Sequence, residues 1–233
     1  MLAVYAPSED VATIERVPFF AGVPQDELRE LAASARRRTY RRGDVIHRVD
    51  DVAGDVFIVT MGHVKHRQVS MDGRQLTHAI NHPGSIFGML SVIDRKRRAG
   101  DAVALTDCEV LVIERDSFAV FLSRHAKATE ILLEHHVASL RRVHELIYDL
   151  AFLSVSARLA KVLLRFATTD GDEEGPGLVV PSYLSQTELA FLVGTSRESV
   201  NQTLRLFGRH GWIESDRKHV RILDEGGLRG IIA

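Results

Sequence analysis

The sequence is poor in the features that would place it at once in a specialised class of protein. It holds a single cysteine, Cys108, in 233 residues. One thiol excludes an internal disulfide framework and a cysteine-held iron–sulfur cluster. No apolar run approaches the roughly 18 residues of a membrane span, and the first residues lack the basic and apolar regions of a secretory signal. We therefore expect a soluble, cytoplasmic protein that has no membrane partner.

An excess of charge of either sign is also missing. The 30 Lys and Arg residues balance 31 Asp and Glu residues, which gives a net charge of −1 and an isoelectric point near 6.8. Binding to nucleic acid would therefore depend on a positive field that the fold creates locally. The sequence shows no nucleophile–base pair, phosphate-binding loop or H-E-x-x-H metal motif. Neither an enzyme nor a metal site is expected.

The clearest motif spans Leu184–Phe207 and has the form of two short helices joined by a turn at Gly194. Ser185 and Glu188 fit a capping box, in which each side chain satisfies an amide at the start of the first helix. Gly194 is free to adopt the positive φ that ends a helix, and Ser196 follows as the cap of the second helix. Two capped helices joined by a tight glycine turn are typical of a DNA-reading helix-turn-helix.

The second helix of this pair has an apolar side and a polar side. Val200, Leu204 and Phe207 recur at helical spacing and are predicted to face inward. The residues left to face outward are Arg197, Glu198, Asn201, Gln202 and Arg205. Such a face is suited to reading base edges.

A two-stranded ribbon is predicted after the helix pair. Residues 212–214 and 220–222 are short β-favouring runs that follow the turn residue Gly211. The tip between them carries Arg217 and Lys218, as expected of a basic wing that contacts phosphate.

Residues 39 to about 113 have a different texture, because short β-favouring segments alternate with glycine turns. The predicted strands are Val45–Ile46, Val56–Val59, Val64–Val69, Leu76–Ile80, Ala102–Leu105 and Val110–Ile113. Asp72-Gly73 lies between two of them and is a strong hairpin signal. Glycines that recur about every ten residues indicate a compact all-β barrel or roll. Val110–Ile113 is apolar throughout, so both of its faces are expected to be buried.

Segments on either side are assigned from simpler signals. Pro24, followed by acidic residues, indicates the start of a short helix. The clusters Arg36–Arg38 and Arg41–Arg42 are interpreted as a solvated surface, with a basic patch as the alternative. Residues 159–166 are predicted to form an amphipathic helix, and the acidic, Gly- and Pro-rich Thr168–Gly177 an exposed loop.

A long helix is predicted from Asp116 to about Leu153, with a break near Ser123–Lys127. A coiled-coil seam with 4-3-4-3-4 spacing runs along it: Leu133, Val137, Leu140, His144, Ile147 and Ala151. A second apolar row contains Leu132, Val143, Leu146 and Leu150. One row can pack on the roll and the other on a partner chain. We therefore favour a dimerisation helix over an internal helix buried by its own domain.

The order of glycine-punctuated β-roll, long helix and winged helix-turn-helix resembles the cAMP receptor protein/FNR family of bacterial transcription regulators. The match is most specific in Leu150–Leu153 leading into Arg158–Ala160, and in Val193–Val200. The resemblance implies an α+β fold. Its parts would be a cyclic-nucleotide-binding-like β-roll (jelly roll) at residues 1–115, a dimerisation helix and hinge at 116–153, and a winged helix-turn-helix at 154–233.

By this resemblance, Arg197 and Glu198 enter the major groove of DNA. Arg offers a bidentate fork to guanine and Glu accepts from cytosine, although Glu198 has a purely capping role as its alternative. The family often has a second arginine where this chain has Gln202, whose amide suits adenine. One position of the half-site is therefore expected to differ. The other predicted members of the DNA-binding surface are Ser185, Ser199, Asn201, Arg205, Arg217 and Lys218.

The family's nucleotide-binding cassette is only partly present in this chain. Gly88 and Arg98 match its pattern, and Arg97 stands beside the matching arginine. Met89 replaces the glutamate that binds the ribose. Ala99 replaces the hydroxyl that helps to hold the phosphate.

The adenine end of the site departs from the family pattern as well. Val143 and His144 stand where cAMP-responsive members carry a Thr-Ser pair; His144 is interpreted as a polar seam residue, with sensing as the alternative. Each unmade hydrogen bond to a charged group loses about 1.5–3 kcal/mol. Therefore cAMP is a possible effector, but tight binding in the family manner is not expected. The cationic loop Arg95–Arg98 either attracts another small anionic effector or is a solvated turn.

Other sensors in this family use an iron–sulfur cluster or haem. The cysteine count excludes the first. Haem would need a ligand that points into the roll, for which the candidates are His63, His66, His78, His82 and Cys108. Each is more simply a surface or core residue, so haem is not expected.

Two functions are compared. The first is a homodimeric, sequence-specific transcription regulator, effector-coupled or constitutively active, with RNA polymerase as a further partner by resemblance. Two-fold symmetry would place its recognition helices about 34 Å apart on a pseudo-palindromic site in double-stranded DNA. The alternative is a ligand-binding regulatory module that acts through a protein partner. Arg197, Glu198 and the basic wing favour the first.

Overall fold

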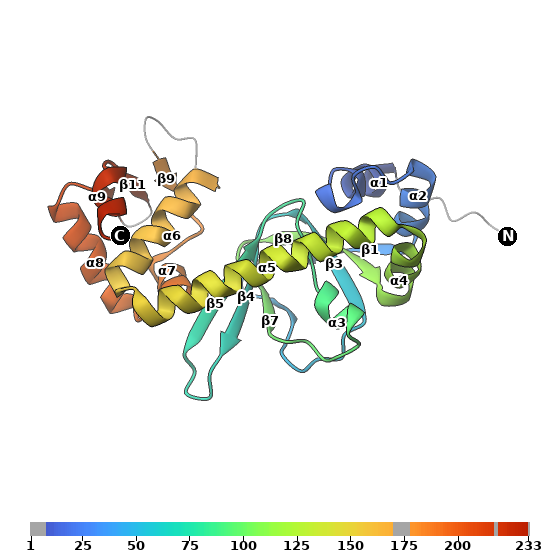
Figure 1. The fold of residues 1–233 in the computed structure, drawn as a ribbon, viewed down its shortest axis with the longest axis horizontal. Coiled ribbons are helices and arrows are strands. Elements are labelled where there is room, and N and C mark those ends of the chain that lie inside the picture. The colour runs from blue at the N-terminus through green and yellow to red at the C-terminus, as the bar shows by residue number, and fades with distance from the viewer. Residues whose placement is uncertain (1–7, 170–177, 217–218, 233) are drawn as a thin grey trace. The chain divides into compact units, whose positions relative to one another are not determined.

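The computed structural model of the chain describes residues 8–169, 178–216 and 219–232. The chain forms two compact units. The N-terminal unit comprises Met1–Gln68 and Ala79–Arg141, and the C-terminal unit comprises Val69–His78 and Arg142–Ala233. The boundary falls within one continuous helix and within one β-hairpin (Figure 1).

The β-roll consists of two four-stranded sheets in the orders β1-β8-β3-β6 and β2-β7-β4-β5. Its strands are β1 (Ala35–Tyr40), β2 (Val45–His47), β3 (Asp55–Met61), β4 (Val64–Val69), β5 (Gln75–Asn81), β6 (Ile86–Phe87), β7 (Asp101–Ala104) and β8 (Cys108–Glu114). All six predicted strands are confirmed within two residues. The predicted Asp72-Gly73 hairpin joins β4 to β5, with Gly73 at φ +82°.

Strand β8 separates two apolar cores, which explains its uninterrupted apolar run. Leu111 and Ile113 pack in the first core with residues of the neighbouring helices. Val110 and Val112 point to the other side and pack inside the roll. The prediction that both faces of this strand are buried is confirmed.

The arginine cluster Arg36–Arg38, expected to be a solvated surface, is part of strand β1. Its side chains stay at the surface, but two of them are held by carboxylates. Arg36 pairs with Glu114, and the Arg37 Nε donates to the buried Asp10 at 2.6 Å. The strand was missed because three successive positions are charged and show no alternation, and only pairing with β8 shows that they lie on an extended segment.

Short helices close the first core. They are α1 (Ser8–Glu15), a 3-10 turn at Pro18–Phe20, α2 (Gln25–Ala33), α3 (Met89–Ile93) and α4 (Arg115–Arg124). The predicted helix start at Pro24 is confirmed, whereas α1 and α3 have no counterpart in the sequence-based prediction. Phe20 and Phe118 are fully buried between these helices and the roll.

Helix α5 (Ala126–Phe152) is one unbroken helix that follows α4 after His125, so the predicted break is confirmed (Figure 1). Ala128 and Leu132 are buried against the first core. The predicted seam is exposed instead, with Leu133 at 65%, Leu140 at 56% and Ile147 at 59% of their full accessible surface. One face of α5 is therefore used within the chain, and an apolar face remains uncovered.

The C-terminal unit is a winged helix-turn-helix. Its elements are α6 (Val155–Thr169), β9 (Leu178–Val180), α7 (Gln186–Val193), α8 (Arg197–Arg209), β10 (Ile213–Ser215), β11 (Val220–Ile222) and α9 (Glu225–Gly230). The strands form an antiparallel sheet in the order β10-β11-β9. Leu159, Leu163 and Phe207 are fully buried at the centre of the helices.

The predicted loop at Thr168–Gly177 is wrong at its first two residues. Helix α6 continues through Thr169, and the hydroxyls of Thr168 and Thr169 donate to carbonyls one turn earlier in the helix. Residues 170–177 lie outside the described residues. Among the helices of residues 8–169, 178–216 and 219–232, none is long and apolar enough to cross a membrane.

Candidate DNA-binding surface and effector site

Local hydrogen bonds build the first helix of the helix-turn-helix. The Oγ of Ser185 accepts from the backbone N–H of Glu188 at 3.3 Å, so the predicted cap is confirmed. At the other end, Gly194 adopts φ +70° and its N–H donates to the Ala190 carbonyl. The glycine reverses the chain at once, and this fixes the start of the next helix.

The recognition helix α8 is capped by Ser196, whose Oγ accepts from the backbone N–H of Ser199 at 3.2 Å. The two serine hydroxyls also lie 3.2 Å apart, which places Ser199 in the cap. Val200, Leu204 and Phe207 are buried, as predicted from their spacing. The burial of this row fixes which side chains of α8 face outward.

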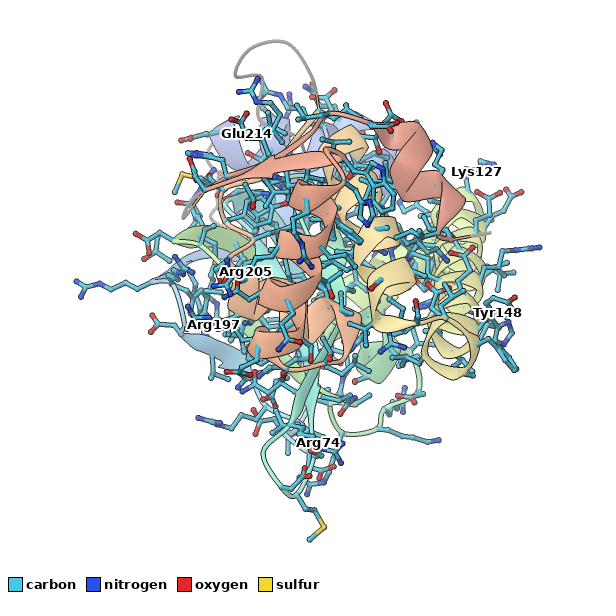
Figure 2. The ribbon with its side chains drawn as sticks, turned by 90° about the vertical axis from the view of Figure 1, so that its left-hand side faces the viewer. Arg74, Lys127, Tyr148, Arg197, Arg205 and Glu214 are labelled. Atoms are coloured by element: carbon cyan, nitrogen blue, oxygen red, sulfur yellow. The ribbon has the colours of Figure 1, made fainter. Side chains whose placement is uncertain are left out.

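The outward side of α8 carries exposed polar and cationic groups. Arg197, Gln202 and Arg205 are exposed, and Asn201 is half-buried. Gln202 and Arg205 line one hollow together with Gly208 and Arg209. Figure 2, which looks onto the C-terminal unit, labels Arg197 and Arg205 along this helix. The predicted wing residues Arg217 and Lys218 lie outside the described residues.

Glu198 has a structural task at the start of α8. Its pKa is lowered, first by its own backbone N–H and then by the hydroxyl of Ser196, with a smaller contribution from Arg197. The carboxylate is therefore held in its ionised form by the cap. Arg197 differs, since it forms no ion pair within 4 Å among the described residues.

In the N-terminal unit, Arg98 is a buried cation whose side chain and main chain are both held by hydrogen bonds. Only 4% of its surface is exposed, and its guanidinium donates to the carbonyls of Gly88 at 2.8 Å and Asp55 at 2.6 Å. Its main chain is fixed by paired hydrogen bonds with Asp50 and Asp51. Gly88 has φ +84°, and a Cβ there would lie 2.8 Å from Nη1 of Arg98. Only glycine allows this approach.

Within the N-terminal unit, the other predicted cassette residues do not join Arg98. Met89 is buried in the first core, on the opposite side of the sheet from the roll interior. Ala99 is exposed and its carbonyl accepts from Gln68 at 2.7 Å, while the exposed Arg97 donates to the Asp50 carbonyl. Val143 and His144 are exposed on α5 and belong to the C-terminal unit.

Two histidines, His47 and His66, lie in the roll interior near this arginine. His47 was not among the residues predicted from the sequence to belong to a site. The rings of Phe57 and Phe87 stack at 4.9 Å. His47 lies 6.0 Å from the Phe57 ring and 6.3 Å from the His66 ring. Burial, and next the charge of Arg98, lower the pKa of His47 to about 4. Its position at the end of the predicted strand Val45–Ile46 was its only signal.

Comparison with known proteins gives a domain family for each of the two units. A cyclic nucleotide-binding domain model matches residues 37–125, and a Crp-like helix-turn-helix domain model matches residues 157–231. The chain is 32% identical over 215 residues to the CRP-like cAMP-activated global transcriptional regulator of Mycobacterium tuberculosis, covering 92% of this chain and 96% of that protein.

The chain belongs to the Crp-Fnr family. It is also 30% identical to the cyclic AMP receptor protein of Thermus thermophilus, over 83% of this chain and 87% of that one. The fold is shared with FixK2 of Bradyrhizobium japonicum, with a TM-score of 0.76 and 22% identity over 85% of this chain and 98% of that one. The protein is therefore a DNA-binding transcription regulator of the Crp-Fnr type.

A cyclic nucleotide is the effector that this family suggests, and the residues fit it only in part. Arg98 supplies a buried cation, held against the carbonyl of Gly88, and a fixed positive charge suits an oxyanion. The ribose partner is absent, because Met89 faces another core, and Ala99 offers no hydroxyl to the phosphate. Val143 and His144 replace the Thr-Ser pair that contacts the adenine. The site thus fits a phosphate-like group but not a cyclic nucleotide held in the family manner.

The haem candidates are spread over the roll. His82 is exposed, and Cys108 is buried, with burial raising the pKa of its thiol to about 11. His63 lies in the turn before β4, while His66 and His78 lie in β4 and β5. In the described part of the chain, no three His, Cys, Asp or Glu side chains are grouped to hold a metal ion.

Proposed function

We propose that this regulator acts as a homodimer and reads a pseudo-palindromic site with α8, with Arg197 as its principal base reader. The observation that carries the proposal is the state of this side chain. Arg197 stands exposed at the first turn of the recognition helix and is not committed to an ion pair within the described residues. Its guanidinium is therefore free to bond guanine O6 and N7.

The neighbouring residues divide into readers and supports. Gln202 is exposed five residues further along α8 and suits adenine. Arg205 is proposed as a phosphate contact, which is supported by its position in the outward-facing hollow beside Arg209. Ser185, Ser199 and Glu198 serve mainly as caps that orient the two helices. Arg217 and Lys218 are proposed as phosphate contacts of the wing.

The exposed apolar seam of α5 supports the homodimer. Leu133, Leu140 and Ile147 leave an apolar strip on one side of a 27-residue helix. Solvent exposure of such a strip is unfavourable, and pairing with the same strip of a second chain covers it. Val137, His144 and Ala151 complete the proposed interface. A regulator of this kind works on the chromosome, so we place it in the cytoplasm with RNA polymerase as its further partner.

The proposed effector is a small anion bound at Arg98, and cAMP is expected to bind weakly. The buried guanidinium supports an anion, while the missing ribose and adenine partners argue against a tight cyclic nucleotide complex. A chain that needs no effector is the alternative within this proposal. Measuring DNA affinity with cAMP, cGMP and cyclic dinucleotides separates the two, since a tenfold change corresponds to about 1.4 kcal/mol of coupling.

The test of the DNA-binding proposal uses the full chain. Selection from random DNA gives the preferred site, and fluorescence anisotropy gives its affinity at several salt concentrations. Arg197→Glu should abolish specific binding, while Arg229→Glu, a charge reversal at an exposed position of α9, should leave the preference unchanged. Gln202→Arg should move one half-site position from adenine towards guanine. An unchanged affinity of Arg197→Glu for the selected site would refute the assignment.

A further inference from the structure

The roll interior contains a buried cation without a counter-ion. Arg98 has only neutral carbonyl acceptors, from Gly88 and Asp55, and it forms no ion pair within 4 Å among the described residues. Burial lowers its pKa, and the nearest carboxylates, Asp55 and Asp51, only partly offset this. Buried charges in proteins are normally paired, so an unpaired guanidinium marks a place where an anion is stabilised.

A second orphaned polar group lies next to it. Both ring nitrogens of His47 are shielded from solvent, and neither has a hydrogen-bond partner of good geometry among the described residues. An interaction with the backbone of Gly100 raises the pKa of His47, but burial and the charge of Arg98 lower it by more. Buried polar side chains are almost always satisfied, so each exception calls for a partner that binds there. A neutral imidazole can give one N–H donor, and an imidazolium gives two.

The aromatic ring of Phe57 links the two groups. The Arg98 Cζ lies 5.4 Å from its centroid, and the His47 ring lies 6.0 Å from the same centroid. The charge of Arg98 is also felt at His47, where it disfavours the imidazolium. A metal cation between the two imidazoles is disfavoured for the same reason, because the guanidinium would repel it.

We propose that His47 is the second arm of an oxyanion site with Arg98, and that binding of the oxyanion adds a proton to His47. Arg98 supplies the fixed positive charge, and His47 supplies the N–H donor that Ala99 and Met89 do not. The negative ligand offsets the repulsion between the two bases, so the imidazole takes up a proton from solvent when the site fills. The ligand class is a sulfate- or phosphate-like group, alone or on an organic body.

The other charged groups around His47 are already engaged. Asp51 accepts from the backbone N–H of Arg48 at 2.7 Å. Asp101 accepts from the backbone N–H of Val49 and from Arg67. Both carboxylates raise the pKa of His47 slightly, less than Arg98 lowers it. His66 is the remaining titratable neighbour, at 6.3 Å between ring centroids.

The inference rests on the proposed anionic effector but not on DNA recognition. The anion site and the proposed DNA-binding function can therefore fail separately. The probes are sulfate and cAMP, whose charges stay constant between pH 5.5 and 7.5. Binding to the full-length protein is measured by titration calorimetry across this range. Sulfate tests the bare oxyanion, and cAMP tests one carried by an organic body. Buffers of different ionisation enthalpy report the protons taken up.

At least one probe should bind about tenfold more tightly at pH 5.5 than at pH 7.5, with close to one proton taken up per chain at pH 5.5 and little at pH 7.5. His47→Gln should retain weaker binding without the pH dependence, and Arg98→Gln should lose binding. His82→Gln, the same change at an exposed position of the roll, should behave as the unaltered protein. NMR should show the His47 resonance titrating at higher pH when the probe is present.

Failure of both probes to bind at pH 5.5, or an unaltered pH dependence in His47→Gln, overturns the inference. Circular dichroism and thermal melting confirm that each variant is folded. Specific DNA binding is measured on the same samples. Loss of DNA recognition by the unaltered protein would count against the proposed function and leave the anion result intact.

Discussion

The guanidinium of Arg158 donates from Nε to the carbonyl of Val193 at 2.9 Å. Its Nη1 donates to the carbonyl of Leu153, also at 2.9 Å. Val193 is the last residue of α7, and Leu153 directly follows α5. One side chain therefore satisfies carbonyls at two helix ends and ties the end of the long helix to the helix-turn-helix.

Removing this tie should destabilise the C-terminal unit. Arg158→Ala leaves two part-buried carbonyls without their charged donor, and we expect a loss of about 2–3 kcal/mol in the free energy of unfolding. The free energy of unfolding of Arg158→Lys should lie between those of Arg158→Ala and the unaltered chain, because an ammonium has no planar fork to reach both carbonyls. Urea denaturation measures the change. Arg229→Ala, which breaks an exposed pair with Glu225, should lose about 0.5 kcal/mol or less.

Two glycines of the helix-turn-helix should respond to alanine with opposite signs. Gly194 has φ +70°, so Gly194→Ala should destabilise by about 1–2 kcal/mol, and its Cβ would also lie 3.0 Å from Leu150. Gly208 lies within α8 with no atom closer than 3.9 Å to a new Cβ. Gly208→Ala should stabilise by about 0.5–1 kcal/mol. Equal effects in thermal unfolding would contradict the role given to Gly194.

Charges placed in the seam of α5 should separate the proposed dimer. Leu140→Glu combined with Ile147→Glu puts four carboxylates in one apolar interface, whose desolvation is unfavourable. Light scattering should give a mass near 26.0 kDa for this variant and twice that mass for the unaltered chain. Ala138→Glu, exposed on the same helix but off the seam, should remain dimeric. A monomeric unaltered chain would exclude the interface.

The stability of the N-terminal unit should depend on pH through His47. Burial and Arg98 lower its pKa from 6.5 to about 4 in the folded chain, so the unfolded chain binds more protons between these values. Stability is therefore highest above pH 6.5 and falls as the pH drops towards 4, by at most about 1.4 kcal/mol per pH unit from this group. Denaturation without sulfate or phosphate should show a shallower fall in His47→Gln than in His82→Gln.

The helix-turn-helix is the part that local sequence signals describe most fully. The caps at Ser185 and Ser196 and the turn at Gly194 depend on residues within four positions of one another. Such contacts involve only residues close together in the sequence, so spacing alone predicts them. The same holds for the buried row Val200, Leu204 and Phe207, which follows the helical period.

Elements without periodicity were missed for a physical reason. Strand β1 has charges at successive positions, and its place in the sheet depends on pairing with β8. Helix α3 has five residues and no side-chain cap, so no local signal marks its start. In both cases distant partners supply the stabilisation that the segment itself lacks.

The sequence by itself determined the family, the order of roll, long helix and winged helix-turn-helix, and the polar face led by Arg197. Local caps, turns and periodic burial encode all of these. Only the tertiary structure decided which cassette residues meet. In the folded chain, Met89 packs in the first core. His47 of β2 and Arg98, which follows α3, instead meet around the Phe57 ring inside the roll. No spacing along the chain encodes that meeting, because two sheets must close before buried charge and imidazole become neighbours.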